Sequence, residues 1–191
     1  MANNTYLYFV SGLFTAPDSA GTWTKLATKW MREHGYCDLP GSYDYFAAVF
    51  GGLLRDDEAA AIIAKDFIDA IAADKKITAV GHSNGCRILM HTLKLFPKLR
   101  IENLHLIAAW DDADCNANGL NEAVARGQLG KVIFYVSAVD NILANGKLGK
   151  AGPHAMSDML KAITGIVSEP MMHSEWVHEK FEWMMAQIVA A

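Results

Sequence analysis

The chain alternates short apolar runs with longer segments in which apolar residues recur every three or four positions. Runs rich in β-branched and aromatic residues predict strands, and the spacing of three to four residues predicts amphipathic helices. On this basis strands are expected over residues 5–12, 44–50, 76–83, 104–110, 131–138 and 164–170. Helices are expected over residues 22–35, 56–74, 119–130, 153–163 and 175–190, and from Gly85 to near Pro97.

Strands and helices that alternate along a chain favour a parallel sheet covered by helices on both faces, particularly when the strands are almost continuously apolar. The pattern therefore predicts the α/β class, with a doubly wound, mostly parallel six-stranded sheet. No internal repeat, low-complexity tract or linker interrupts the 191 residues. We expect one domain that spans residues 1–191.

Charge and composition narrow the partners that this domain is expected to have. The net charge is −4 and no run of lysine or arginine is present, which argues against nucleic-acid binding through a basic face. No window approaches the apolar length of a membrane helix, and the N-terminal residues lack a charged leader. Three widely spaced cysteines, an odd number, favour free thiols. We expect a cytoplasmic protein without membrane insertion, whereas its oligomeric state stays undetermined.

The residues that follow the predicted strands carry the candidate chemistry. In open α/β sheets the functional crevice lies at the carboxyl ends of the strands. Ser83 follows the third predicted strand, Asp140 the fifth and His173 the sixth. A hydroxyl, a carboxylate and an imidazole, the three groups of a serine triad, are thus expected at one edge.

The segment "VGHSNGC" places Ser83 between Gly81 and Gly85, at the change from strand to helix. This G-x-S-x-G pattern in its strand–turn–helix context resembles the nucleophile elbow of the α/β-hydrolase family, and the chain order of Ser83, Asp140 and His173 is also that family's order. The resemblance covers essentially the whole chain. It implies an α/β-hydrolase fold, here without a large cap domain, because only about twenty residues separate the fourth and fifth predicted strands.

The resemblance also implies roles for these side chains, and alternatives stay open for two of them. Ser83 would be the nucleophile and His173 the base, with His154 and His178 as the competing histidines. Asp140 would be the acid. Asp111 or Asp112, which follow the fourth predicted strand, are the alternative positions for the acid.

The same resemblance implies an oxyanion hole made of two main-chain N–H groups. One belongs to Asn84, directly after the nucleophile. The other belongs to the loop after the first predicted strand, where Leu13 is the expected donor and Phe14 its neighbour or substitute.

Several side chains beside these loops are candidates for substrate binding. One of these candidates is His82, which occupies the variable position of the elbow. Its side chain is expected to point away from the serine hydroxyl. Phe14, Trp110, Leu143 and Met171 could line an acyl pocket, although each fits an ordinary core position as well.

Together these features predict a serine hydrolase that cleaves a small-molecule carboxylic ester through an acyl-enzyme, without a cofactor. A thioesterase, an acyltransferase or a non-catalytic binding module on the same fold are the alternatives. The segment 112–119 has oxygen-bearing residues at alternate positions, but Ala117 and Ala123 stand where a calcium loop needs glycine and glutamate. We interpret it as a solvated loop and predict no catalytic metal.

Overall fold

A computed structural model describes residues 4–12, 22–36, 40–43, 56–109, 113–137, 139–140 and 165–190, with only the backbone described for residues 56 and 113–118. The strands are β1 (Thr5–Val10), β2 (Gly41–Tyr43), β3 (Lys76–His82), β4 (Ile101–Ile107), β5 (Leu129–Val136) and β6 (Gly165–Ser168). The helices are α1 (Trp23–Glu33), α2 (Asp56–Ala72), α3 (Asn84–Leu95), α4 (Ala113–Ala125), the short 3-10 helix η2 (Glu175–Val177) and α7 (Phe181–Ala190).

The six described strands form one sheet in the order β2-β1-β3-β4-β5-β6, and every neighbouring pair is parallel. The chain runs from β1 outward to β2 and then returns to place β3 on the other side of β1. The carboxyl ends of β1 and β3 therefore lie side by side where the winding direction reverses, with Val10 paired to Gly81. This is the place where open α/β sheets bind ligands.

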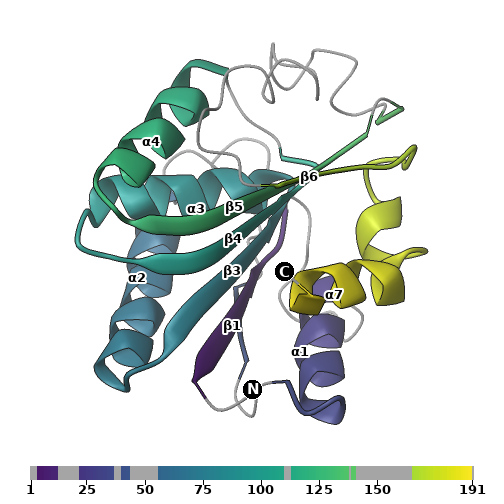
Figure 1. The fold of residues 1–191 in the computed structure, drawn as a ribbon, viewed down its shortest axis with the longest axis horizontal. Helices are drawn as coiled ribbons and strands as arrows, with labels where there is room; N and C mark the ends of the chain where they lie inside the picture. Colours follow the sequence, from purple (N-terminus) through teal and green to yellow (C-terminus); the bar gives the residue numbers. More distant parts are fainter. Residues whose placement is uncertain are drawn as a thin grey trace.

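Helices cover both faces of the sheet, as Figure 1 shows: α2, α3 and α4 lie on one side, and α1 and α7 on the other. Each face has its own apolar core. One core joins the sheet to α2, α3 and α4 around side chains such as Phe67 and Leu89. The other joins it to α1, η2 and α7 around Trp23 and Trp176. The predicted doubly wound α/β class is confirmed.

Most predicted elements are present with shifted ends. Strand β4 begins at Ile101, earlier than predicted. The polar residues Glu102 and Asn103 follow Ile101, so the start of this strand is not an apolar run. The predicted strand over 44–50 and the predicted helix over 153–163 lie outside the described residues.

Two predictions about helices are wrong. The segment 112–119, interpreted as a solvated loop, is helical from Ala113, and α4 ends at Ala125 instead of extending toward residue 130. Ala, Asp and Asn suit the first turns of a helix as well as a loop. The closing helix is divided into η2 and α7, since Trp176 turns inward to pack edge-on against Tyr135, with 6.0 Å between ring centroids.

Within the described residues, no helix has both the length and the apolar character needed to span a membrane. Among the described residues, Cys86 is buried and forms no disulfide, and its thiol donates to the Ile107 main-chain oxygen at 3.6 Å.

Candidate active site

Ser83 occupies a strained turn between β3 and α3. Its backbone has φ 55° and ψ −124°, a region that L-residues rarely adopt and that costs about 1–3 kcal/mol. The turn is held by hydrogen bonds from Ser83 N to Ile107 O (2.9 Å) and from Cys86 N to Ser83 O (3.1 Å). A serine kept in such a conformation by its surroundings is the feature expected of a nucleophile elbow.

The two glycines of the elbow are required by close backbone contacts. A Cβ atom at Gly81 would lie 2.8 Å from Cys86 N, inside the first turn of α3. A Cβ atom at Gly85 would meet Val10 O and would lie 2.7 Å from Ser11 O, at the end of β1. Both positions therefore exclude any larger residue, and the elbow closes tightly against the end of the neighbouring strand.

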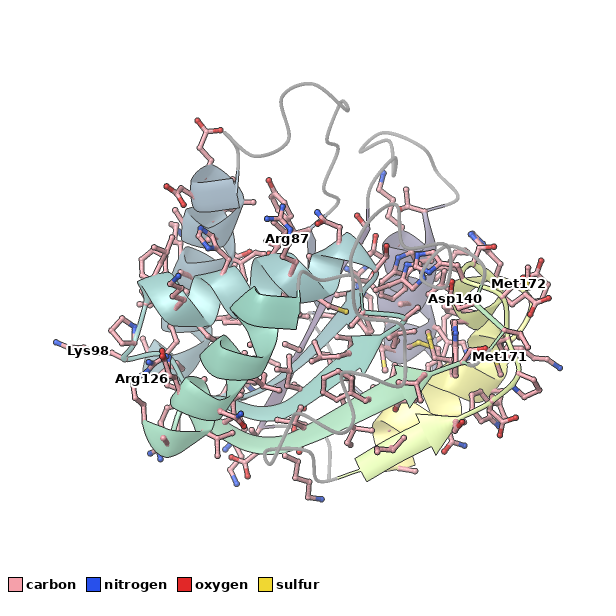
Figure 2. All side chains as sticks on the ribbon, turned by 90° about the horizontal axis from the view of Figure 1, so that it is seen from above. Arg87, Lys98, Arg126, Asp140, Met171 and Met172 are labelled. Atoms are coloured by element: carbon pink, nitrogen blue, oxygen red, sulfur yellow. The ribbon has the colours of Figure 1, made fainter. Side chains whose placement is uncertain are left out.

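Asp140 and His173 are in direct contact. Nδ1 of His173 lies 2.9 Å from Oδ2 of Asp140. Asp140 is only 1% exposed, and the His173 side chain is 15% exposed. Because a carboxylate accepts this bond, Nδ1 of His173 is the nitrogen that donates it, and Nε2 is the ring nitrogen left to act as a base. Figure 2 shows Asp140, Met171 and Met172 at one end of the molecule, opposite Lys98 and Arg126.

The segment that carries His173 is attached to the loop that carries Asp140. The Ser137 hydroxyl, directly after β5, accepts hydrogen bonds from Val139 N (3.2 Å) and Met171 N (3.0 Å). The Glu175 carboxylate accepts a further bond from Met172 N at 2.7 Å. These hydrogen bonds fix the backbone next to Asp140 and the backbone next to His173.

Ser83 directly follows His82, whose ring contacts His173, and among these described residues no hydrogen bond joins Ser83 to His173. Nε2 of His82 lies 2.9 Å from the His173 main-chain oxygen, and the two imidazole centroids are 5.1 Å apart. His82 therefore links the strand that ends beside Ser83 to the segment that carries His173. In substrate-free enzymes the bond between nucleophile and base is often long and tightens only when substrate binds.

His82 itself is buried, at 7% exposed. Burial, and secondarily the proximity of His173, lower its pKa to about 3, so that the ring is neutral at physiological pH. Its contacts are with the core and with His173, so its predicted role in substrate binding has no support from these contacts.

The other predicted residues differ in how far the structure describes them. Asn84 is described, as the buried first residue of α3. Met171 is 6% exposed and packs in the core beneath α1 and α7, so the predicted substrate contact of its side chain stays a prediction. The competing residue His178 is exposed, just after η2. The predicted residues that lie outside the described part of the chain are Leu13, Phe14, Trp110, Asp111, Asp112, Leu143 and His154.

Two residues of this region were not singled out from the sequence. A Cβ atom at Gly12 would lie 2.8 Å from the Ser83 Cβ and 3.3 Å from its Oγ, so this glycine directly faces the candidate nucleophile. Ser137 connects the loops of Asp140 and His173. Each lies within two residues of the end of an observed strand. Gly12 is the last residue of the strand predicted over 5–12, whereas Ser137 lies inside the strand predicted over 131–138, so a rule based on the ends of predicted strands would have included only Gly12.

In the described residues, no three His, Cys, Asp or Glu side chains lie together in a way that could hold a metal ion. The described part of the site therefore supplies a hydroxyl, an imidazole and a carboxylate.

Comparison with known proteins gives structural likeness at low sequence identity. No family model matches the chain, and no curated protein matches its sequence. The structure is similar to the type II thioesterase YbtT from the yersiniabactin biosynthetic pathway (16% identity, TM-score 0.55, covering 100% of this chain and 94% of that one). It is also similar to the Paleococcus ferrophilus monoacylglycerol lipase (12%, 0.59, 99% and 96%).

A third similar structure is a putative hydrolase of the alpha/beta superfamily from Xanthomonas campestris pv. campestris (10% identity, TM-score 0.56, covering 98% of this chain and 97% of that one). These similarities extend over nearly the full length of both chains in each case. They show that the chain has the α/β-hydrolase fold, and the described residues contain no large cap domain.

Proposed function

We propose that this chain is a serine hydrolase that cleaves carboxylic esters through an acyl-enzyme. The observation that carries the proposal is the combination of Ser83 at φ 55° on a strand-to-helix turn with a partly buried hydrogen bond between His173 and Asp140 at the same edge of the sheet. A strained turn has an energetic cost, and a buried carboxylate needs a partner, so both features are accounted for by a catalytic role.

In the proposed first half-reaction, Ser83 Oγ attacks the ester carbonyl carbon and its proton passes to Nε2 of His173. Asp140 stabilises the imidazolium and keeps the ring in the required tautomer. Main-chain N–H groups of Asn84 and Leu13 are proposed to bind the oxyanion. Collapse of the tetrahedral intermediate breaks the C–O bond, and His173 returns its proton to the departing alkoxide.

In the second half-reaction, water gives a proton to His173 as its oxygen attacks the acyl carbon. The second tetrahedral intermediate expels Ser83 Oγ, which takes the proton back, and the carboxylic acid leaves. The cycle uses the three side chains and main-chain donors, without a cofactor. Asp140 is proposed as the acid because its carboxylate bonds to Nδ1 of His173, whereas the alternatives Asp111 and Asp112 lie outside the described residues.

The surroundings of the acid and base favour an apolar substituent on the substrate. Val139 and Met172, which directly precede Asp140 and His173, are both exposed large apolar side chains. An acyl chain or an apolar alcohol can cover such side chains at the mouth of a site. A small-molecule ester is therefore the proposed substrate, and no nucleic-acid or membrane partner is proposed.

A fluorophosphonate probe tests the nucleophile. We expect the wild-type chain to be labelled and Ser83→Ala to lose labelling while its circular dichroism spectrum is unchanged. Ser42→Ala, the same change at an exposed serine in β2, is the matched control and should label normally. Labelling that survives Ser83→Ala would remove Ser83 from its role, and an unlabelled wild type would favour a binding module.

A substrate panel then tests the reaction class. p-Nitrophenyl esters of increasing acyl length should be hydrolysed by wild type and not by Ser83→Ala. Acyl thioesters and an added alcohol acceptor, run in parallel, report thioesterase and acyltransferase activity. Turnover of thioesters without turnover of esters would replace the ester by a thioester as the proposed substrate class.

A further inference from the structure

The ring of His82 joins the strand of the nucleophile to the segment of the base. His82 is the last residue of β3, directly before Ser83, and its Nε2 lies 2.9 Å from the main-chain oxygen of His173. The two residues are 91 positions apart in the chain. The position of the elbow and the position of the base are therefore linked by one side chain.

The chemistry of the acceptor determines how this bond is formed. A main-chain carbonyl can only accept, so Nε2 of His82 must be the protonated nitrogen. A neutral imidazole carries one proton, and Nδ1 of His82 is consequently unprotonated. Burial is the main cause that lowers the pKa of His82 and favours this neutral form, followed by the proximity of His173, whereas the hydrogen bond to the His173 main chain and the Asp140 carboxylate act in the opposite direction.

Packing holds the His82 ring in place between the core and the base. On one side it meets Trp23 edge-on, with 6.1 Å between centroids and an interplanar angle of 76°. On the other side it lies 5.1 Å from the His173 ring, at 46°. Because these two contacts restrict movement of the His82 ring, the hydrogen bond from this ring also restricts movement of the His173 carbonyl.

The attachment made by His82 differs from the others in this segment. Ser137 connects Met171 to the loop that carries Asp140, and Glu175 binds Met172 from within the same segment. His82 instead binds the peptide of His173 itself, from the strand that ends in Ser83. The Ser137 contact fixes the base relative to the acid, the Glu175 contact is local to the segment, and the His82 contact fixes the base relative to the nucleophile.

We propose that His82 is a positioning residue, which donates a hydrogen bond from Nε2 to the His173 carbonyl and so sets the distance between the base and Ser83. The proposal rests on the proposed function, because it assigns His82 to the triad of that reaction. It takes no part in proton transfer. Its effect is on orientation, for which a displacement of about 1 Å can lower a rate by about a hundredfold.

Two substitutions separate the hydrogen bond from the packing. His82→Phe keeps a ring against Trp23 and removes the donor, and His82→Gln keeps an N–H donor at a similar reach. We expect His82→Phe to lower kcat on a p-nitrophenyl ester by about tenfold to a hundredfold with KM nearly unchanged, since substrate contacts are untouched. His82→Gln should recover most of kcat. Equal loss in both variants, or wild-type kcat in His82→Phe, would overturn the proposal.

A measurement that does not depend on catalysis distinguishes failure of the proposed role of His82 from failure of the proposed function. In ¹⁵N-labelled Ser83→Ala, long-range ¹H–¹⁵N correlation should show His82 neutral and protonated on Nε2 at pH 7. The far-downfield Nδ1 proton of His173 should shift or broaden when His82→Phe is added, and it should be restored by His82→Gln. A His82 protonated on Nδ1 would overturn the proposed role of His82 whatever the reaction, whereas persistent fluorophosphonate labelling of Ser83→Ala would overturn the proposed function alone.

Discussion

Nδ1 of His173 lies 2.9 Å from Oδ2 of Asp140, and the carboxylate is almost completely shielded from solvent. The two residues belong to loops that follow different strands, β5 and β6, which pair directly in the sheet. Parallel pairing brings the ends of these strands to one edge, and the hydrogen bond then orients the imidazole. The contact therefore depends on sheet topology as well as on the two side chains.

Replacing Asp140 by asparagine should disable the base with little change of shape. An amide can donate to Nδ1 and so favour the wrong tautomer of His173, and the known precedent in serine triads is a loss of about 10⁴ in kcat. The measurement is steady-state hydrolysis of a p-nitrophenyl ester. Asp57→Asn, at an exposed carboxylate that binds His91, is the matched control and should keep full activity. A loss of only a few-fold in Asp140→Asn would transfer the acid role to Asp111 or Asp112.

Ser137→Ala should lower both stability and activity. Its hydroxyl accepts two main-chain N–H bonds, and a buried donor left without a partner costs about 1–3 kcal/mol. We expect the urea midpoint to fall by an amount equivalent to about 2 kcal/mol at unchanged m value. Activity should fall because the segment of His173 loses its attachment to the loop of Asp140. Ser42→Ala at the surface is the control, and an equal urea midpoint in both variants would contradict this role of Ser137.

Gly12→Ala should reduce activity through a direct clash with the nucleophile. The added Cβ would lie 2.8 Å from the Ser83 Cβ and 3.2 Å from the His82 main-chain oxygen, and over-packing of this kind costs about 1–3 kcal/mol. The rate of fluorophosphonate labelling measures the effect at Ser83 directly.

The same substitution at Gly119 is the control for this experiment. Gly119 lies in α4, where a Cβ atom would meet nothing within 4 Å. Alanine in a helix is favoured over glycine by about 0.5–1 kcal/mol, so Gly119→Ala should be slightly stabilising and should label normally. Normal labelling of Gly12→Ala would show that the space around Ser83 adapts to an extra methyl group.

The elbow was readable from the sequence because its signal is local. A strand, a G-x-S-x-G turn and a helix lie within one continuous segment, and the close contacts of Gly81 and Gly85 are what the pattern encodes. The candidate acid and base could be located because parallel strands share one edge. The fold class was predictable for the same reason, since strands and helices alternate regularly along the chain.

The supporting contacts were not readable, because they join residues far apart in the chain. Ser137 and Met171 are separated by 34 positions and His82 and His173 by 91, and no local pattern reports such pairs. Tertiary packing also decided where the closing helix divides: Trp176 is completely buried against the sheet, and periodicity alone predicted one continuous helix. Long-range packing overrides local propensity at such places.

His105 should make stability fall on acidification. Its ring is fully buried in β4, with Nδ1 3.0 Å from the Tyr135 hydroxyl, and burial, followed by the charge of Lys131, lowers its pKa from 6.5 to about 4. In the unfolded chain His105 therefore binds a proton below about pH 6.5. In the folded chain it binds a proton only below about pH 4. The stabilising contribution is complete above pH 6.5 and is lost as the pH falls to about 4, by about 3 kcal/mol in total.

Urea unfolding measured at intervals from pH 7 to pH 4 tests this linkage. His105→Asn keeps a polar atom near the position of Nδ1 and removes the titrating ring, so the slope of unfolding free energy against pH should decrease by up to about 1.4 kcal/mol per pH unit, the value for one proton. Tyr135→Phe is the control: it removes the hydrogen bond but leaves the imidazole buried, and should lower stability while keeping the slope. An unchanged slope in His105→Asn would mean that another group takes up the proton, because this histidine would then bind protons equally in the folded and unfolded chains.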